Sequence, residues 1–217
     1  MKKIYGILIL GLLAFAACRK NDNIPADSGC INRIHRVDYH VSAADSLAAI
    51  STLQQNKITY GDLDLEYVST YTVGDTAFFQ SIFLIQEVNG LPVLSGDLWY
   101  QFKKGVLQTV TGTRYKDISL DTHPTRTLPQ LRAAYLAAVD KYKYGSNIIS
   151  DAPFSVKDSC VVAEFGYYDL NATTNGAPPN IVKAWSVSPT PGSYPQVFFR
   201  DDNGKLILYN GGPVLLN

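Results

Sequence analysis

The feature that most constrains the fold of this 217-residue chain is a period of two in its apolar residues. Between residues 62 and 116 apolar and polar side chains alternate, as at Leu98, Tyr100 and Phe102. This alternation is typical of strands that bury one face. The run 78–85 is almost wholly apolar, which predicts a strand buried on both faces. The sequence therefore predicts a large β-sheet in this region.

The connections between these strands predict that they are antiparallel. Asn89-Gly90 is a strong signal for a tight hairpin, and Lys104-Gly105 is a second turn. We expect two helices, at 42–55 with Ser42 as N-cap and Leu47, Ile50 and Leu53 on its apolar face, and at 127–142. Further strands are predicted at 159–170, 181–188, 195–200 and 205–209. Because the helices are few and lie between runs of strands, the predicted class is α+β.

The N-terminus predicts an exported protein. Lys2 and Lys3 precede an apolar run at 4–17, and small residues come directly before Cys18. This arrangement resembles the lipobox of bacterial lipoproteins, which implies a signal peptide at 1–17 and a lipid on Cys18. The alternative is an ordinary secretory signal cleaved near Ala17, with Cys18 as a free thiol.

Residues 18–30 are polar and predict a tether that holds the domain off the membrane. We expect a membrane-anchored lipoprotein of the cell envelope, in the outer membrane, with the periplasmic and surface faces both open. If Cys18 carries lipid, Cys30 and Cys160 remain. Two thiols in an oxidising compartment usually pair, so we expect a disulfide between them, the alternative being two separate buried thiols.

A family resemblance rests mainly on residues 88–98, Val-Asn-Gly-Leu-Pro-Val-Leu-Ser-Gly-Asp-Leu. This run, with 100–107 and 118–131, resembles the fungalysin/thermolysin propeptide domain. Residues 160–211 resemble a PepSY domain, through Ala-Trp-Ser-Val at 184–187 and the turn at 202–205. The resemblance implies a propeptide-like domain at 31–145 and a PepSY-like domain at 146–217. In this arrangement each half is an antiparallel sheet packed by a helix, which is a cystatin-like or PepSY-like fold.

The resemblance also implies a function. In thermolysin-like metallopeptidases the propeptide covers the active-site cleft and precedes a catalytic domain with a His-Glu-x-x-His helix. This chain contains no such motif. We therefore expect a non-enzymatic binding protein that inhibits a secreted metallopeptidase or helps it to fold. The alternative is an envelope lipoprotein that binds a peptide or a glycan without any peptidase partner.

The remaining residue patterns favour neither catalysis nor nucleic-acid binding. Basic and acidic residues number 19 each, so no positive excess exists to bind phosphate backbones. His35, His40 and His123 are poorly spaced for joint zinc binding, and 201–204 is predicted to be a hairpin turn rather than a calcium loop. We expect no catalytic residues, metal or cofactor.

The predicted partner-binding residues are two tryptophans and an apolar C-terminal tail. They are Trp99, Trp185, Val214, Leu215 and Leu216. The aromatic side chains could form a patch for a peptide or sugar, or could belong to the core and the sheet surface. The tail could lie in a peptidase cleft like a substrate, or could pair as a final edge strand.

Overall fold

The computed structural model describes residues 29–35, 41–61, 63–73, 77–142, 160–174, 176–190 and 194–211. Within them the α+β class is confirmed, because two helices accompany one mostly antiparallel sheet of nine strands. The helices are α1 (Ala43–Gln55) and α2 (Leu128–Tyr142). The strands are β1 (Ile31–Ile34), β2 (Leu63–Val73), β3 (Ala77–Val88), β4 (Leu91–Lys103), β5 (Val106–Thr111), β6 (Cys160–Asp169), β7 (Ile181–Thr190), β8 (Gln196–Arg200) and β9 (Leu206–Asn210).

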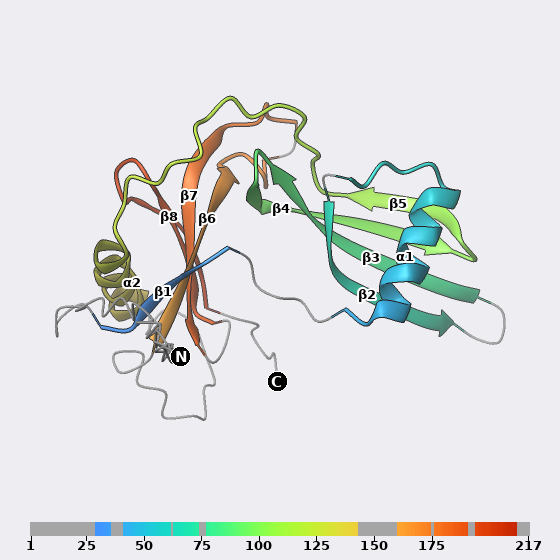
Figure 1. Cartoon of the computed structure of the whole chain (residues 1–217), viewed down its shortest axis with the longest axis horizontal. Coiled ribbons are helices and arrows are strands. Elements are labelled where there is room, and N and C mark those ends of the chain that lie inside the picture. Colours follow the sequence, from blue (N-terminus) through green and yellow to red (C-terminus); the bar gives the residue numbers. More distant parts are fainter. Residues whose placement is uncertain are drawn as a thin grey trace, which may run out of the picture.

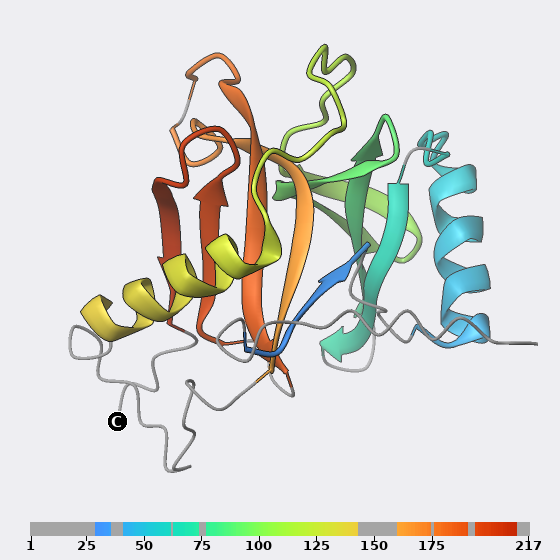
Figure 2. The same ribbon diagram turned by 60° about the vertical axis from the view of Figure 1, so that its left-hand side comes forward.

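The chain contains the same arrangement twice, a helix followed by four antiparallel strands. Figure 1 shows α1 against the β2–β5 half and α2 beside the β6–β9 half, and Figure 2 shows α2 crossing the face of β6–β9. Each helix buries apolar side chains against its own half of the sheet, Leu53 of α1 with Ile82 and Tyr135 of α2 with Trp185. The two halves therefore have separate cores.

The predicted hairpins are confirmed by the backbone at both turns. Asn89 and Gly90 have φ angles of 53° and 74°, and Lys104 and Gly105 have 50° and 77°. Positive φ at both central residues defines the type I′ turn, whose twist matches that of the flanking strands. Ser42 also caps α1 as predicted, since its hydroxyl accepts a hydrogen bond from the Asp45 amide at 3.1 Å.

The prediction that 78–85 is buried on both faces is wrong. Ile82 and Leu84 are buried beneath α1, whereas Phe79 and Phe83 on the other face of the strand are only half-buried. The physical reason is that no described helix covers the opposite face of β2–β5. The aromatic side chains there lose contact with water by packing on one another instead.

The apolar face predicted for α1 is also partly wrong. The helix rests on Ala49 and Leu53, which are almost fully buried, whereas Leu47 is 69% exposed. A small alanine at the contact lets the helix approach the sheet closely.

Strand β6 connects the two halves. One edge pairs along its whole length with β7, and the other edge pairs with β1 and, further along, with β4 at Val93 and Tyr167. β4 can reach both halves because it is irregular. Four residues of β4 lie between Pro92 and Asp97, whereas only one residue of β3 lies between their partners Glu87 and Ile85. Such an irregularity bends a strand.

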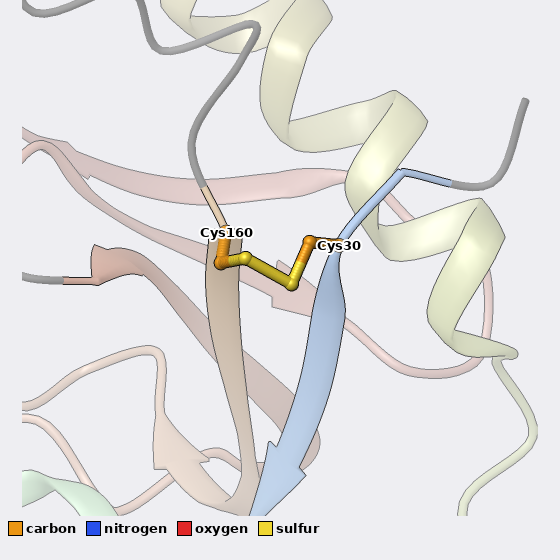
Figure 3. Close-up of a disulfide and its surroundings, with 2 residues drawn as sticks. All are labelled: Cys30 and Cys160. Atoms are coloured by element: carbon orange, nitrogen blue, oxygen red, sulfur yellow. A yellow bond between two sulfur atoms is a disulfide. The ribbon is translucent and has the colours of Figure 1, made fainter.

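A disulfide fastens β1 to β6, as predicted. Cys30 lies directly before β1 and Cys160 opens β6, with a sulfur–sulfur distance of 2.11 Å (Figure 3). The two cysteines are 130 residues apart in the sequence. The bridge therefore ties the N-terminal arm to the C-terminal half of the sheet.

Candidate binding site

The candidate site is a hollow of about 820 Å³ between the two halves of the sheet. In Figure 1 the strands of the two halves run in different directions, with β4 and β6 at their junction. Val162, Glu164 and Tyr168 line the hollow from β6, while Val161, Ala163 and Phe165 of the same strand belong to the core beneath α2. Because side chains alternate along a strand, the hollow lies on the face of β6 opposite α2.

The first half of the sheet contributes Glu66, Ile85 and Asp97 to the hollow. Ile85 and Asp97 are cross-strand neighbours on the face of β3 and β4 that points away from α1, since Leu84 and Leu98 beside them are buried under that helix. The hollow is therefore bounded by the two sheet faces that α1 and α2 leave uncovered. A concave site of this size between two structural units is a common location for a bound ligand.

The described lining combines apolar walls with negative charge. Its apolar members include Ile34, Val162, Phe198 and Leu208, and its carboxylates are Glu66, Asp97 and Glu164. None of the lining residues that the structure describes is lysine, arginine or histidine. Low-dielectric walls around charges of one sign strengthen the local field, so the hollow favours cationic groups.

Asp97 lies directly after the irregular segment of β4. Its side chain is exposed to water within the hollow. The surrounding protein nevertheless removes part of the hydration of its carboxylate, and this desolvation raises the pKa of Asp97. Within the described chain, no hydrogen bond or ion pair compensates this carboxylate.

A row of aromatic side chains crosses the same uncovered face beside the hollow. Tyr67, Phe83 and Trp99 are cross-strand neighbours on β2, β3 and β4. The Phe83 and Trp99 rings are stacked with centroids 5.5 Å apart, and the Tyr67 and Phe83 centroids are 5.8 Å apart. The row extends the candidate site, because Phe83 and Trp99 lie two residues from Ile85 and Asp97 along their strands.

The structure does not bring together the two tryptophans that were predicted to bind a partner. Trp99 is half-buried on the uncovered face, as described above. Trp185 is only 1% exposed, lies in the core beneath α2, and donates a hydrogen bond from Nε1 to the Asp201 carboxylate at 2.8 Å. Trp185 is therefore not accessible to a partner. The tail residues Val214, Leu215 and Leu216, and the lipidation residue Cys18, lie outside the described residues.

The predicted turn at 201–204 joins β8 to β9, and its first residue has a structural role that the sequence analysis missed. Asp201 is fully buried, and its carboxylate accepts hydrogen bonds from the backbone amides of Thr125 and Arg126. The Lys183 ammonium lies 3.8 Å from the same carboxylate. These contacts hold the segment before α2 against the far end of the sheet. No local pattern predicts a pairing across 75 residues.

The two histidines that the structure describes, His35 and His123, show no sign of a shared site. His35 is exposed at the end of β1, and His123 is exposed beside Asp121, while His40 lies outside the described residues. In the part of the chain that the structure describes, no three His, Cys, Asp or Glu side chains lie close enough together to hold a metal ion. Neither of the two described helices is long and apolar enough to cross a membrane.

Comparison of the sequence with protein-family models and with curated proteins finds no match.

Proposed function

We propose that this protein is a non-catalytic binding module of the bacterial cell envelope, anchored by a lipid on Cys18. Its partner would be a secreted thermolysin-like metallopeptidase that it inhibits or helps to fold. The fold would be that of a propeptide domain followed by a PepSY domain. The repeated order of a helix and four antiparallel strands supports this proposal.

The observation that carries the binding role is the hollow between the uncovered sheet faces. Sheets are normally covered on their apolar faces, and a large concave surface with exposed aromatic side chains is typical of a contact surface. The choice of a peptidase as partner rests on the resemblance of residues 88–107 to the propeptide family. The hollow supplies the surface on which a segment of that partner would lie.

The proposal of a non-catalytic role rests on how the protein uses its buried acids. Asp169 accepts hydrogen bonds from Tyr115, Asn171 and Asn180, and Asp201 accepts from Thr125, Arg126 and Trp185. Both carboxylates hold loops and strands together. Each also accepts a hydrogen bond from a hydroxyl group, Asp201 from Thr125 and Asp169 from Tyr115, but both carboxylates are buried and no histidine is among the contacts described.

The test is an inhibition assay with the full chain in detergent and a secreted thermolysin-like peptidase from the same cells. We expect inhibition that saturates at equal concentrations of the two proteins, together with a complex that survives gel filtration. The same assay on a chain that ends at Gly211 asks whether the apolar tail contributes. Absence of both inhibition and complex with every such peptidase of the organism would contradict the peptidase proposal.

The lipid anchor has its own test. The unaltered chain should stay in the membrane fraction and incorporate labelled palmitate. A Cys18→Ser chain should leave the membrane fraction and stay unlabelled. Retention of the serine variant in the membrane, still unlabelled, would show that something other than the lipid holds the protein there.

The second candidate is an envelope lipoprotein that binds a peptide or a glycan without a peptidase partner. The aromatic row of Tyr67, Phe83 and Trp99 favours it, because sugar rings and peptide side chains both stack on exposed aromatic faces. A Trp99→Ala chain distinguishes the two candidates. Loss of binding on a glycan array, with no effect in the peptidase assay, would support the second.

A further inference from the structure

We infer that the hollow is a recognition pocket for an arginine side chain, presented by an extended segment of the partner polypeptide. This inference rests on the proposed function, because the partner polypeptide supplies the arginine. It adds the chemical identity of the group that enters the hollow.

Charge complementarity is the first argument. Three strands, β2, β4 and β6, each bring one carboxylate to the hollow, at Glu66, Asp97 and Glu164. The described lining residues include no basic side chain to balance them. Glu66 and Glu164 also take part in contacts within the protein, so Asp97 is the carboxylate most available to a ligand.

The arrangement of the acids indicates an organic cation rather than a metal ion. No group of three potential ligands in the described residues lies close enough together to bind a metal. Calcium, for example, needs six to eight oxygen ligands at about 2.3–2.6 Å. Carboxylates spread around a hollow of about 820 Å³ match a larger group, whose charge is spread over several donors. The planar guanidinium group of arginine has five such donors.

The walls of the hollow suit the remainder of an arginine side chain. Its aliphatic stem can pack on apolar surface while its charged end contacts the carboxylates. Ile85 is the cross-strand neighbour of Asp97, and Val162 and Phe198 line the other side. Trp99 and Phe83 form an adjacent aromatic surface on which a guanidinium group can stack.

Asp97 gives the pocket a physical reason to bind a cation. Its carboxylate has lost part of its hydration without gaining a partner among the residues that the structure describes, which is unfavourable for the ionised form. An incoming guanidinium group would replace the lost water contacts with a charge-assisted hydrogen bond. The raised pKa of Asp97 is consistent with a site that is completed only by its ligand.

The test compares two short blocked peptides of valine and threonine that differ in one central residue, arginine in the first and citrulline in the second. Citrulline has almost the same shape as arginine but no charge. Binding of each fluorescently labelled peptide to the full chain in detergent is followed by anisotropy. We expect the arginine peptide to bind about tenfold more tightly than the citrulline peptide. The affinity of a lysine peptide should lie between those of the arginine and citrulline peptides. Its ammonium group carries the charge but does not present two parallel donors to one carboxylate, as a guanidinium group does.

The matched variants are Asp97→Asn and Asp117→Asn. Asp117 is exposed and is not among the residues that line the hollow. The Asp117→Asn substitution therefore removes the same charge at a site outside the hollow. We expect Asp97→Asn to weaken the arginine peptide about fivefold and leave the citrulline peptide unchanged, with Asp117→Asn like the unaltered chain. Equal binding of the two peptides, no binding of either, or no effect of Asp97→Asn would each overturn the inference.

The inference and the proposed function can fail separately. A peptidase that binds the Asp97→Asn chain as tightly as the unaltered chain would leave the proposed function intact and contradict the arginine pocket. Arginine-specific peptide binding without any peptidase complex would support the pocket and contradict the peptidase partner.

Discussion

The Tyr115 hydroxyl donates a hydrogen bond of 2.8 Å to the carboxylate of Asp169, and this contact joins the segment after β5 to the end of β6. Both residues are buried. The Asp169 carboxylate also accepts hydrogen bonds from the backbone amides of Asn171 and Asn180, in the loop before β7. The backbone amide of Asp169 donates a hydrogen bond to the Ser95 hydroxyl on β4. A single buried residue, Asp169, therefore connects the two halves of the sheet at the edge of the hollow, through its backbone amide and its carboxylate.

Replacing Tyr115 by phenylalanine should destabilise the protein by about 1–2 kcal/mol, because it leaves a buried carboxylate with one donor fewer. Urea unfolding at neutral pH measures this loss. Tyr67→Phe is the matched control, since Tyr67 is 56% exposed and should lose much less. Equal effects of the two substitutions would show that the Tyr115 hydrogen bond contributes nothing specific.

The same tyrosine predicts a dependence on alkaline pH. Burial, with the Asp169 contact as the second cause, raises the pKa of Tyr115 above its ordinary value of 10.0. Because the folded state holds the Tyr115 proton more tightly than the unfolded state does, the contribution of Tyr115 to stability is fully present below pH 10. This contribution is lost as the pH rises above 10. The stability difference between the unaltered chain and Tyr115→Phe should therefore shrink above pH 10. A difference that stays constant across that range would contradict this explanation.

Gly166 is predicted to be essential for the junction of β4 and β6. A Cβ atom at this position would lie 2.3 Å from the carbonyl oxygen of Pro92, which is backbone and cannot rotate away. Gly166→Ala should therefore cost at least about 2 kcal/mol, as substitutions that overpack an interior do. Gly61→Ala is the control, because a Cβ atom there meets nothing within 4 Å. Thermal unfolding of both chains decides the comparison.

Removing the disulfide should destabilise the N-terminal arm and the protein as a whole. The bridge closes a loop across 130 residues, for which the chain-entropy description gives a contribution of roughly 4–5 kcal/mol and measured values are often about 2–4. We expect a chain with alanine at both Cys30 and Cys160 to unfold at lower urea concentration and to expose β1 to proteolysis. The control is the unaltered chain under oxidising conditions. Unchanged stability of the double variant would contradict a structural role for the bridge.

Asp97 is predicted to lower the stability of the unliganded protein. Its pKa is raised by desolvation, so the folded state favours the protonated form and stability is lost as the pH rises from 3.8 through the raised value. The ionisable groups that line the hollow with it are Glu66 of β2, Glu164 and Tyr168 of β6, and Tyr194, which precedes β8. Asp97→Asn should therefore be more stable than the unaltered chain at neutral pH, and the difference should disappear in acid. A less stable Asp97→Asn chain at neutral pH would contradict this reading, and Asp117→Asn controls for the change in net charge.

Features set by neighbouring residues could be predicted from the sequence. The N-cap at Ser42 and the hairpin at Asn89 and Gly90 depend on a few adjacent residues, and both are confirmed. The pairing of Cys30 with Cys160 followed from cysteine number and compartment, and it is confirmed as well. Local physical chemistry was sufficient in these cases.

Features that depend on distant residues could not be predicted. Trp99 and Trp185 each lie within a predicted strand, and their neighbours in the sequence do not distinguish them. Of their two sheet faces, only the one that holds Trp185 is covered by a helix. The hollow was missed because Glu66, Asp97 and Glu164 come from three separate strands. Their proximity depends on the irregular segment of β4, and no composition or spacing rule predicts where such a bend occurs.

The most direct test of the account is the affinity of a secreted thermolysin-like peptidase for chains altered inside and outside the hollow. Leu208 lines the hollow and is 44% exposed, and Leu47 is 69% exposed on α1, so both accept a charged residue without disturbing a core. We predict that Leu208→Arg abolishes the complex by adding bulk and a competing positive charge, whereas Leu47→Arg binds like the unaltered chain. A Leu208→Arg chain that binds the peptidase as tightly as Leu47→Arg would contradict the claim that the hollow is the binding site.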